Sequence, residues 1–129
     1  MTYAALNSYK QNSVVTATPE ELTLMLYDGA IKFMNISKYS IENKDLERAH
    51  SSLIRSQDII NELNYSLDMK YEISEEMRKL YDFISSKLVD ANIRKDIASI
   101  EEALVITHEM RDTWKEVIQQ VKQKVYQAK

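Results

Sequence analysis

The residues of this sequence that could do chemistry are its two histidines and the carboxylates near them. Glu47 and His50 have the Glu-x-x-His spacing by which one helix of a bundle offers a carboxylate and an imidazole to a metal ion. A two-metal site needs a second such pair, but the residue three positions before His108 is Val105. We therefore interpret Glu47 and His50 as solvated side chains near a helix start and expect no metal site.

Nucleophilic catalysis lacks its usual groups. The chain has no cysteine, and neither histidine lies beside a serine nucleophile or a glycine-rich turn. The single glycine, Gly29, cannot form a phosphate-binding loop. We expect that the chain is not an enzyme and that it has no catalytic residue, no cofactor and no small-molecule substrate.

The composition of the 129 residues favours helices and excludes several kinds of partner. One glycine, one proline and 29% charged residues indicate an all-α fold with short turns. A net charge of −3, with both signs interspersed, offers no basic stripe for nucleic acid. The sequence has no signal-peptide pattern and no run of about 18 apolar residues, so we expect no membrane insertion. The absence of cysteine fits a cytoplasmic location.

Helix-start signals divide the chain into four long helices. Thr18 is a predicted N-cap, and Pro19 is the predicted first residue of a helix that runs to about Glu42. The predicted caps of the three following helices are Asp45, Ser74 and Asp96. In the second helix, apolar or small residues recur at heptad spacing and predict a packing seam of Leu46, Ala49, Leu53, Ser56, Ile60, Leu63 and Leu67.

The helices have matching lengths of roughly 30–45 Å and are joined by short turns, which makes neighbours antiparallel. We therefore predict an all-α fold, an antiparallel up-down four-helix bundle with a short N-terminal arm or helix. The expected organisation is an arm over residues 1–17 and a single-domain helical bundle over residues 18–129.

Apolar residues on the first two helices exceed what one buried stripe can hold, and we expect the excess to form an exterior groove. The residues concerned are Leu24, Tyr27, Ile31 and Met34 on the first helix and Ile54 and Ile59 on the second. Such a groove can bind an amphipathic helix, and Tyr3, Leu6 and Tyr9 of the arm could cover part of it. The alternative is a structural helical protein whose apolar face is a constitutive homodimer interface.

Several segments resemble the flagellar secretion chaperones of the FliS family. They include Tyr9 to Val14, the run from Thr16 to Leu22 and the run from Met25 to Gly29. Further matches are Gln57 to Asp68, Leu80 to Ile84, Leu88 to Asn92 and Arg111 to Trp114. The resemblance covers nearly the whole chain in the right order.

The resemblance implies a cytoplasmic helical bundle that binds the disordered C-terminal segment of flagellin. Such a chaperone prevents premature polymerisation and delivers flagellin to the flagellar type III export apparatus, so components of the export gate are implied partners. In the family the N-terminal arm occupies part of the empty groove. By match of motif, the implied partner-binding residues are Tyr3, Leu6, Tyr9, Leu22, Leu26, Tyr27, Gln57, Ile60, Leu63 and Asn64.

Overall fold

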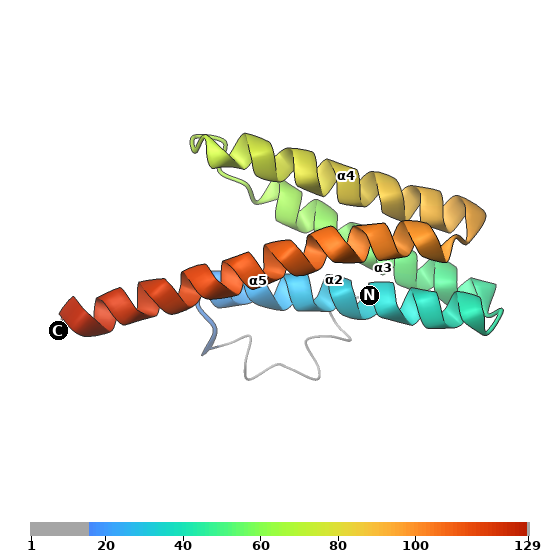
Figure 1. Cartoon of the computed structure of the whole chain (residues 1–129), viewed down its shortest axis with the longest axis horizontal. Helices are drawn as coiled ribbons and strands as arrows, with labels where there is room; N and C mark the ends of the chain where they lie inside the picture. Colours follow the sequence, from blue (N-terminus) through green and yellow to red (C-terminus); the bar gives the residue numbers. More distant parts are fainter. Residues whose placement is uncertain (1–15, 129) are drawn as a thin grey trace.

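The computed structural model describes residues 16–128, which hold four long helices. They are α2 (Pro19–Glu42), α3 (Leu46–Tyr65), α4 (Ile73–Arg94) and α5 (Ile97–Ala128). Each helix packs against the next one in sequence, and α5 returns to pack against α2, so the four form a closed ring of antiparallel neighbours (Figure 1). The predicted up-down bundle is confirmed.

Local capping explains most of the helix boundaries. Thr18 Oγ1 accepts a hydrogen bond from Glu21 N at 3.2 Å, and Pro19 opens α2 as expected. Asp45 Oδ1 caps α3 by accepting from Arg48 N at 3.2 Å. Asp96 caps the start of α5 in the same way, because its Oδ1 accepts a hydrogen bond from Ala98 N at 3.1 Å.

The predicted cap at Ser74 is wrong. Helix α4 begins one residue earlier, at Ile73. Backbone hydrogen bonds from Tyr71 N to Asp68 O and from Ser74 N to Tyr71 O already turn the chain before that point. Ser74 is buried, and its hydroxyl donates to Asp68 O at 2.6 Å, so it closes the preceding loop instead of capping the helix.

The core lies where all four helices are in contact. The seam predicted on α3 is confirmed at Leu53, Ile60 and Leu63, which are buried, whereas Leu46 at the helix start is exposed. The expectation of an exterior groove on α2 is wrong, because Tyr27, Ile31 and Met34 are buried and Leu24 is half-buried. Helix α2 packs against α3 on one side and α5 on the other, so it buries a wider arc than one stripe. On α3, Ile59 is likewise buried, while Ile54 is partly exposed.

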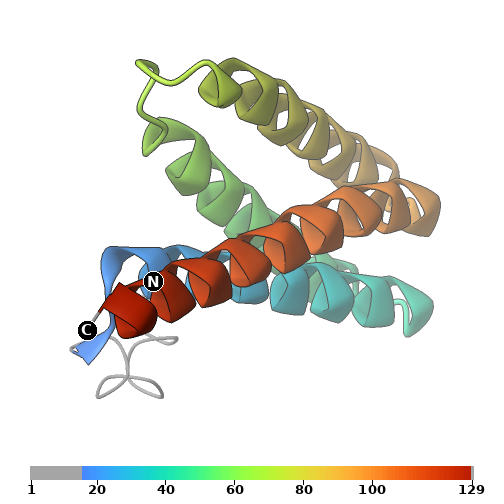
Figure 2. The ribbon, with the colours of Figure 1, turned by 60° about the vertical axis from the view of Figure 1, so that its left-hand side comes forward.

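The bundle is open at one end. The pair α3–α4 and the pair α2–α5 converge near the α2–α3 and α4–α5 turns and diverge toward the opposite end (Figures 1 and 2). Helix α5 has 32 residues, whereas α4 has 22, and its last turns extend beside the start of α2. Within residues 16–128, no helix combines the length and apolar character that crossing a membrane requires.

Two tyrosines meet where the core ends. The Tyr27 and Tyr81 hydroxyl oxygens are 2.5 Å apart, with both side chains buried, and their ring centroids are separated by 6.5 Å. The bond joins α2 to α4 across the bundle. Each hydroxyl is therefore satisfied by the other in a place that excludes water.

We predict that Tyr27→Phe or Tyr81→Phe alone lowers the free energy of unfolding by about 1–3 kcal/mol, because each leaves one buried hydroxyl without a partner. The double Phe variant should lose less free energy of unfolding than the two single variants lose together, because it leaves no buried hydroxyl without a partner. Urea denaturation of the wild type, the two single variants and the double variant measures the coupling energy between the two hydroxyls. The exposed Tyr39→Phe serves as a control with no expected change, and additive losses in the cycle would contradict the prediction.

The same pair predicts a dependence on alkaline pH. Burial raises the pKa of both the Tyr27 and the Tyr81 hydroxyl, so both stay protonated in the folded protein. In the unfolded chain tyrosine titrates at about pH 10. Above that pH the unfolded state loses protons that the folded state keeps, so the stability contributed by the pair is present below about pH 10 and is lost above it. The free energy of unfolding of the wild type should fall more steeply between about pH 9 and 11 than that of the double Phe variant. Parallel slopes would disprove this.

Candidate partner-binding grooves

An apolar groove lies between α4 and α5 at the open end of the bundle. Its volume is about 430 Å³. Helix α4 supplies one wall with Ile73, Met77 and Leu80, and the ring of Tyr27 closes the floor. Helix α5 supplies the other wall with Ile106, Glu109, Met110, Thr113, Trp114 and Val117. We call this space the α4–α5 groove.

The groove follows from the divergence of the helices. On α4, Ile84, Leu88 and Ala91 occupy the inward side where the helices converge, and they are buried. Farther toward the open end, Ile73 and Leu80 keep apolar spacing, but the groove separates them from α5, and they are 64% and 39% exposed. The same kind of apolar stripe therefore builds core at one end and a groove at the other.

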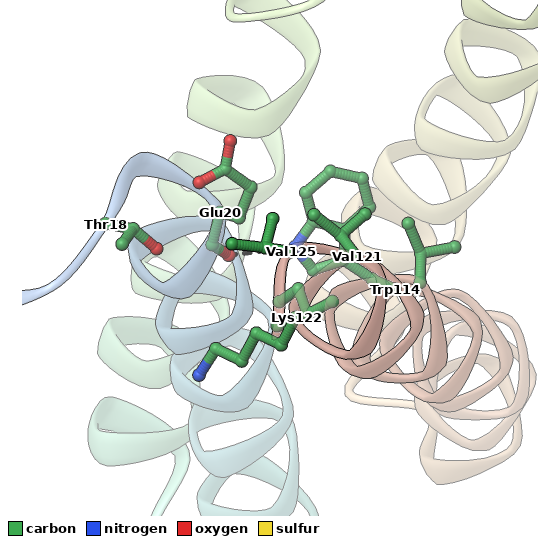
Figure 3. A pocket seen from close by; sticks show the side chains of 8 residues that line it. Thr18, Glu20, Trp114, Val121, Lys122 and Val125 are labelled. Atoms are coloured by element: carbon green, nitrogen blue, oxygen red, sulfur yellow. Dashed lines mark hydrogen bonds between the residues drawn. The ribbon is translucent and has the colours of Figure 1, made fainter. Parts of the chain in front are cut away.

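A second depression lies farther along α5, beside the start of α2 (Figure 3). It has a volume of about 300 Å³ and shares Trp114 and Val117 with the first groove. The Trp114 Nε1 donates to Glu20 O at 2.9 Å, which fixes the indole against the first turn of α2. The remaining lining residues are Thr18, Glu20, Ile118, Val121, Lys122 and Val125. We call this space the α2–α5 depression.

A third depression of about 350 Å³ lies between α3 and α4, near the converging end. It is lined by His50, Gln57, Val89, Asn92, Ile93 and Lys95. His50 Nδ1 is 3.1 Å from Asn92 Oδ1, and Lys95 Nζ donates to the same oxygen at 2.8 Å. His50 is thus engaged with an amide, and no group of three potential metal ligands occurs in the described part of the chain.

Ion pairs hold α5 against α2 next to the grooves. Arg111 Nη1 donates to Asp28 Oδ1 at 2.9 Å, and Arg111 Nε donates to Asp112 Oδ1 at 2.6 Å. The hydrogen bond that Arg111 donates to Asp112 is the main cause that raises the pKa of Arg111. On the same side, Lys122 Nζ is 3.4 Å from Glu21 Oε1.

The predicted partner-binding residues that the structure describes do not lie together on one surface. Tyr27 lies at the floor of the α4–α5 groove but is only 1% exposed, while Leu22 is exposed and Leu26 is half-buried. Gln57 lines the third depression.

The other residues of that set lie elsewhere. Ile60 and Leu63 are in the core. Asn64 makes hydrogen bonds to α4, donating to Asp82 Oδ1 and accepting from Arg78 Nε. Tyr3, Leu6 and Tyr9 fall outside the described residues.

Sequence reasoning missed the walls of the α4–α5 groove. Met77, Leu80 and Trp114 have helical spacing, and spacing alone assigns them to a core. Helix length gave a signal only for the α2–α5 depression, because Val121 and Val125 lie on α5 beyond the 22-residue length of α4. The walls of the α4–α5 groove lie within that length, and no local pattern marks the divergence that opens them.

Comparisons with known proteins agree on one family. The model of the family described as flagellar protein FliS matches residues 1–121. The flagellar secretion chaperone FliS of Bacillus subtilis is 46% identical over 112 residues, which cover 87% of this chain and 84% of that protein. The FliS chaperone of Salmonella typhimurium is 29% identical, with 90% of this chain and 91% of that protein covered.

The fold is also found in a solved structure. A crystal structure of a flagellar chaperone from bacteria superposes with a TM-score of 0.74 and covers 93% of this chain and 99% of that chain. Its sequence is 19% identical, so it supports the helical fold alone. The expectation that the chain is not an enzyme agrees with the family match, since the relatives are secretion chaperones. With the family model matched over residues 1–121 and close identity to the B. subtilis protein, the chain belongs to the FliS family of flagellar proteins.

Proposed function

We propose that this flagellar secretion chaperone binds the disordered C-terminal segment of flagellin in the cytoplasm and prevents its premature polymerisation. Delivery to the flagellar type III export apparatus, through contact with its gate components, belongs to the same proposal. The observation that carries it is the α4–α5 groove, which is apolar, open and bounded by two helices. A groove of this form suits an amphipathic helix that lays its apolar face between the walls.

The energetics favour a segment that folds as it binds. Full burial of an aliphatic or aromatic side chain is worth about 1.5–3 kcal/mol, and several exposed ones border the groove. Ordering a disordered segment offsets part of this gain. The remaining free energy holds the segment while it covers apolar surface that would otherwise stay in water. Flagellin bound in this way cannot offer the same surface to another flagellin.

The contact residues implied by the family remain part of the proposal. Leu22 and Leu26 lie on the first turns of α2, where an extended piece of the partner could pass toward Tyr27. Gln57 offers an amide on α3 for polar contacts with another piece, whereas the Asn64 amide already bonds to Asp82 and Arg78 and would have to share these bonds with a partner. Ile60 and Leu63 are enclosed, so they support the shape of the site without touching a partner unless the helices move. The arm residues Tyr3, Leu6 and Tyr9 are proposed as a removable cover.

We predict that Leu80→Asp weakens binding of a flagellin C-terminal peptide by at least about tenfold, because it removes apolar area and places a charge in the groove. Leu80 is 39% exposed, so the bundle should keep its helix content. Val117→Asp tests the opposite wall, at 41% exposure. Isothermal calorimetry gives the affinities and circular dichroism the helix content.

The matched control is Val105→Asp, which also places a charge on an exposed aliphatic residue of α5, at 56% exposure. Val105 lines none of the three depressions, so binding should not change. If the three Asp variants and the wild type bind the flagellin peptide with equal affinity, the α4–α5 groove is not the binding site.

Binding should also show a large negative change in heat capacity, because coupled folding buries extensive apolar area. Calorimetry at several temperatures measures it. The competing interpretation, a constitutive homodimer, predicts a tight dimer by light scattering that added flagellin peptide leaves unchanged. That result, with no heat of binding, would overturn the chaperone proposal for this surface.

A further inference from the structure

The α4–α5 groove and the α2–α5 depression form one continuous apolar surface along α5. Trp114 and Val117 line both spaces, so no polar ridge separates them. The apolar residues run from Ile106 to Val125. At about 1.5 Å per residue this stretch is roughly 28 Å long, which matches a partner helix of about five turns.

Two carboxylates that line this surface form no ion pair with a described cation. Glu109 lines the α4–α5 groove, and Glu20 lines the α2–α5 depression. Neither has an ion pair within residues 16–128. The Glu20 carboxylate and the Lys122 amine point in different directions in Figure 3.

Within residues 16–128, several cations beside the surface are engaged in ion pairs. Lys122 pairs with Glu21, and Arg111 pairs with Asp28 and Asp112. On the α4 side, Lys79 pairs with Glu76 and Lys87 with Glu102. Lys124 lines neither space. The border of the apolar surface therefore offers net negative charge to whatever lies on it.

We infer that the bound flagellin segment presents a helix whose apolar stripe is flanked by lysine or arginine, and that Glu109 and Glu20 select these basic side chains. The inference rests on the proposed function, since it names the chemistry of the segment in that site. A lysine or arginine can lay its methylene stem on the apolar wall and bring its charge to the carboxylate. Charges at the border of an interface act on partner choice and association rate, and they repel an acidic helix.

The test uses the full chain and the flagellin C-terminal segment as the probe, with fluorescence of the single tryptophan, Trp114, reporting occupancy. Glu109→Lys should weaken binding about three- to tenfold at low ionic strength, and Glu20→Gln should weaken it less. At about 1 M salt the Debye length falls to about 3 Å, so the differences should disappear. The association rate constant should fall with the affinity.

Glu62→Lys is the control with the same change in net charge, because Glu62 is exposed on α3 and lines neither space. It should bind like the wild type. A segment in which the basic residues are replaced by glutamate should bind Glu109→Lys more tightly than it binds the wild type.

The outcomes separate the two proposals. Failure of the segment to bind the wild type overturns the proposed function together with this inference. Binding that is the same for Glu109→Lys, Glu20→Gln and Glu62→Lys at low salt overturns the role of the two carboxylates and leaves the apolar groove in place.

Discussion

The hydrogen bond between the Tyr27 and Tyr81 hydroxyls marks the boundary on which the structure depends. On one side of it the four helices enclose a core, with Ile84 and Leu88 of α4 fully buried. On the other side the helices diverge, and Leu80, one residue before Tyr81, already lines a groove. The pair links α2 to α4 across the bundle, so a buried polar contact in which each hydroxyl has a partner lies at the point where the core ends.

Apolar side chains exposed to water are unfavourable, and most proteins avoid large patches of them. Their arrangement in this protein limits the exposed area. The uncovered side chains lie in concave spaces along α5, beside charged residues that keep the neighbouring surface hydrated. Trp114 lies between two of these spaces, where its indole nitrogen is held by the Glu20 carbonyl. Arg111 and Lys122 tie α5 to α2, so the long helix stays in place without a third neighbour at its end. The proposed binding of an unfolded segment requires this combination of packed helices and exposed apolar area.

The family assignment and the fold could be predicted from the sequence, but the location of the uncovered surface could not. The boundaries of α2, the cap of α3 and the seam through Leu53 and Ile60 depend on residues close together in the chain. The excess of apolar residues was also recognisable. The pattern places this excess on α2 and α3, but Tyr27, Ile31 and Met34 of α2 and Ile59 of α3 are core, because each of these helices contacts two others. The surface lies instead on α4 and α5.

The sequence by itself determined where α2, α3 and α5 begin, the approximate lengths of the helices, and that they carry more apolar side chains than one stripe can use. These properties arise from capping, propensity and spacing, which act within a few residues. Only the tertiary structure decided which apolar side chains meet another helix and which remain uncovered. That depends on the angle at which the pairs α2–α5 and α3–α4 diverge, and the angle is set by packing among all four helices rather than by the pattern on any one of them.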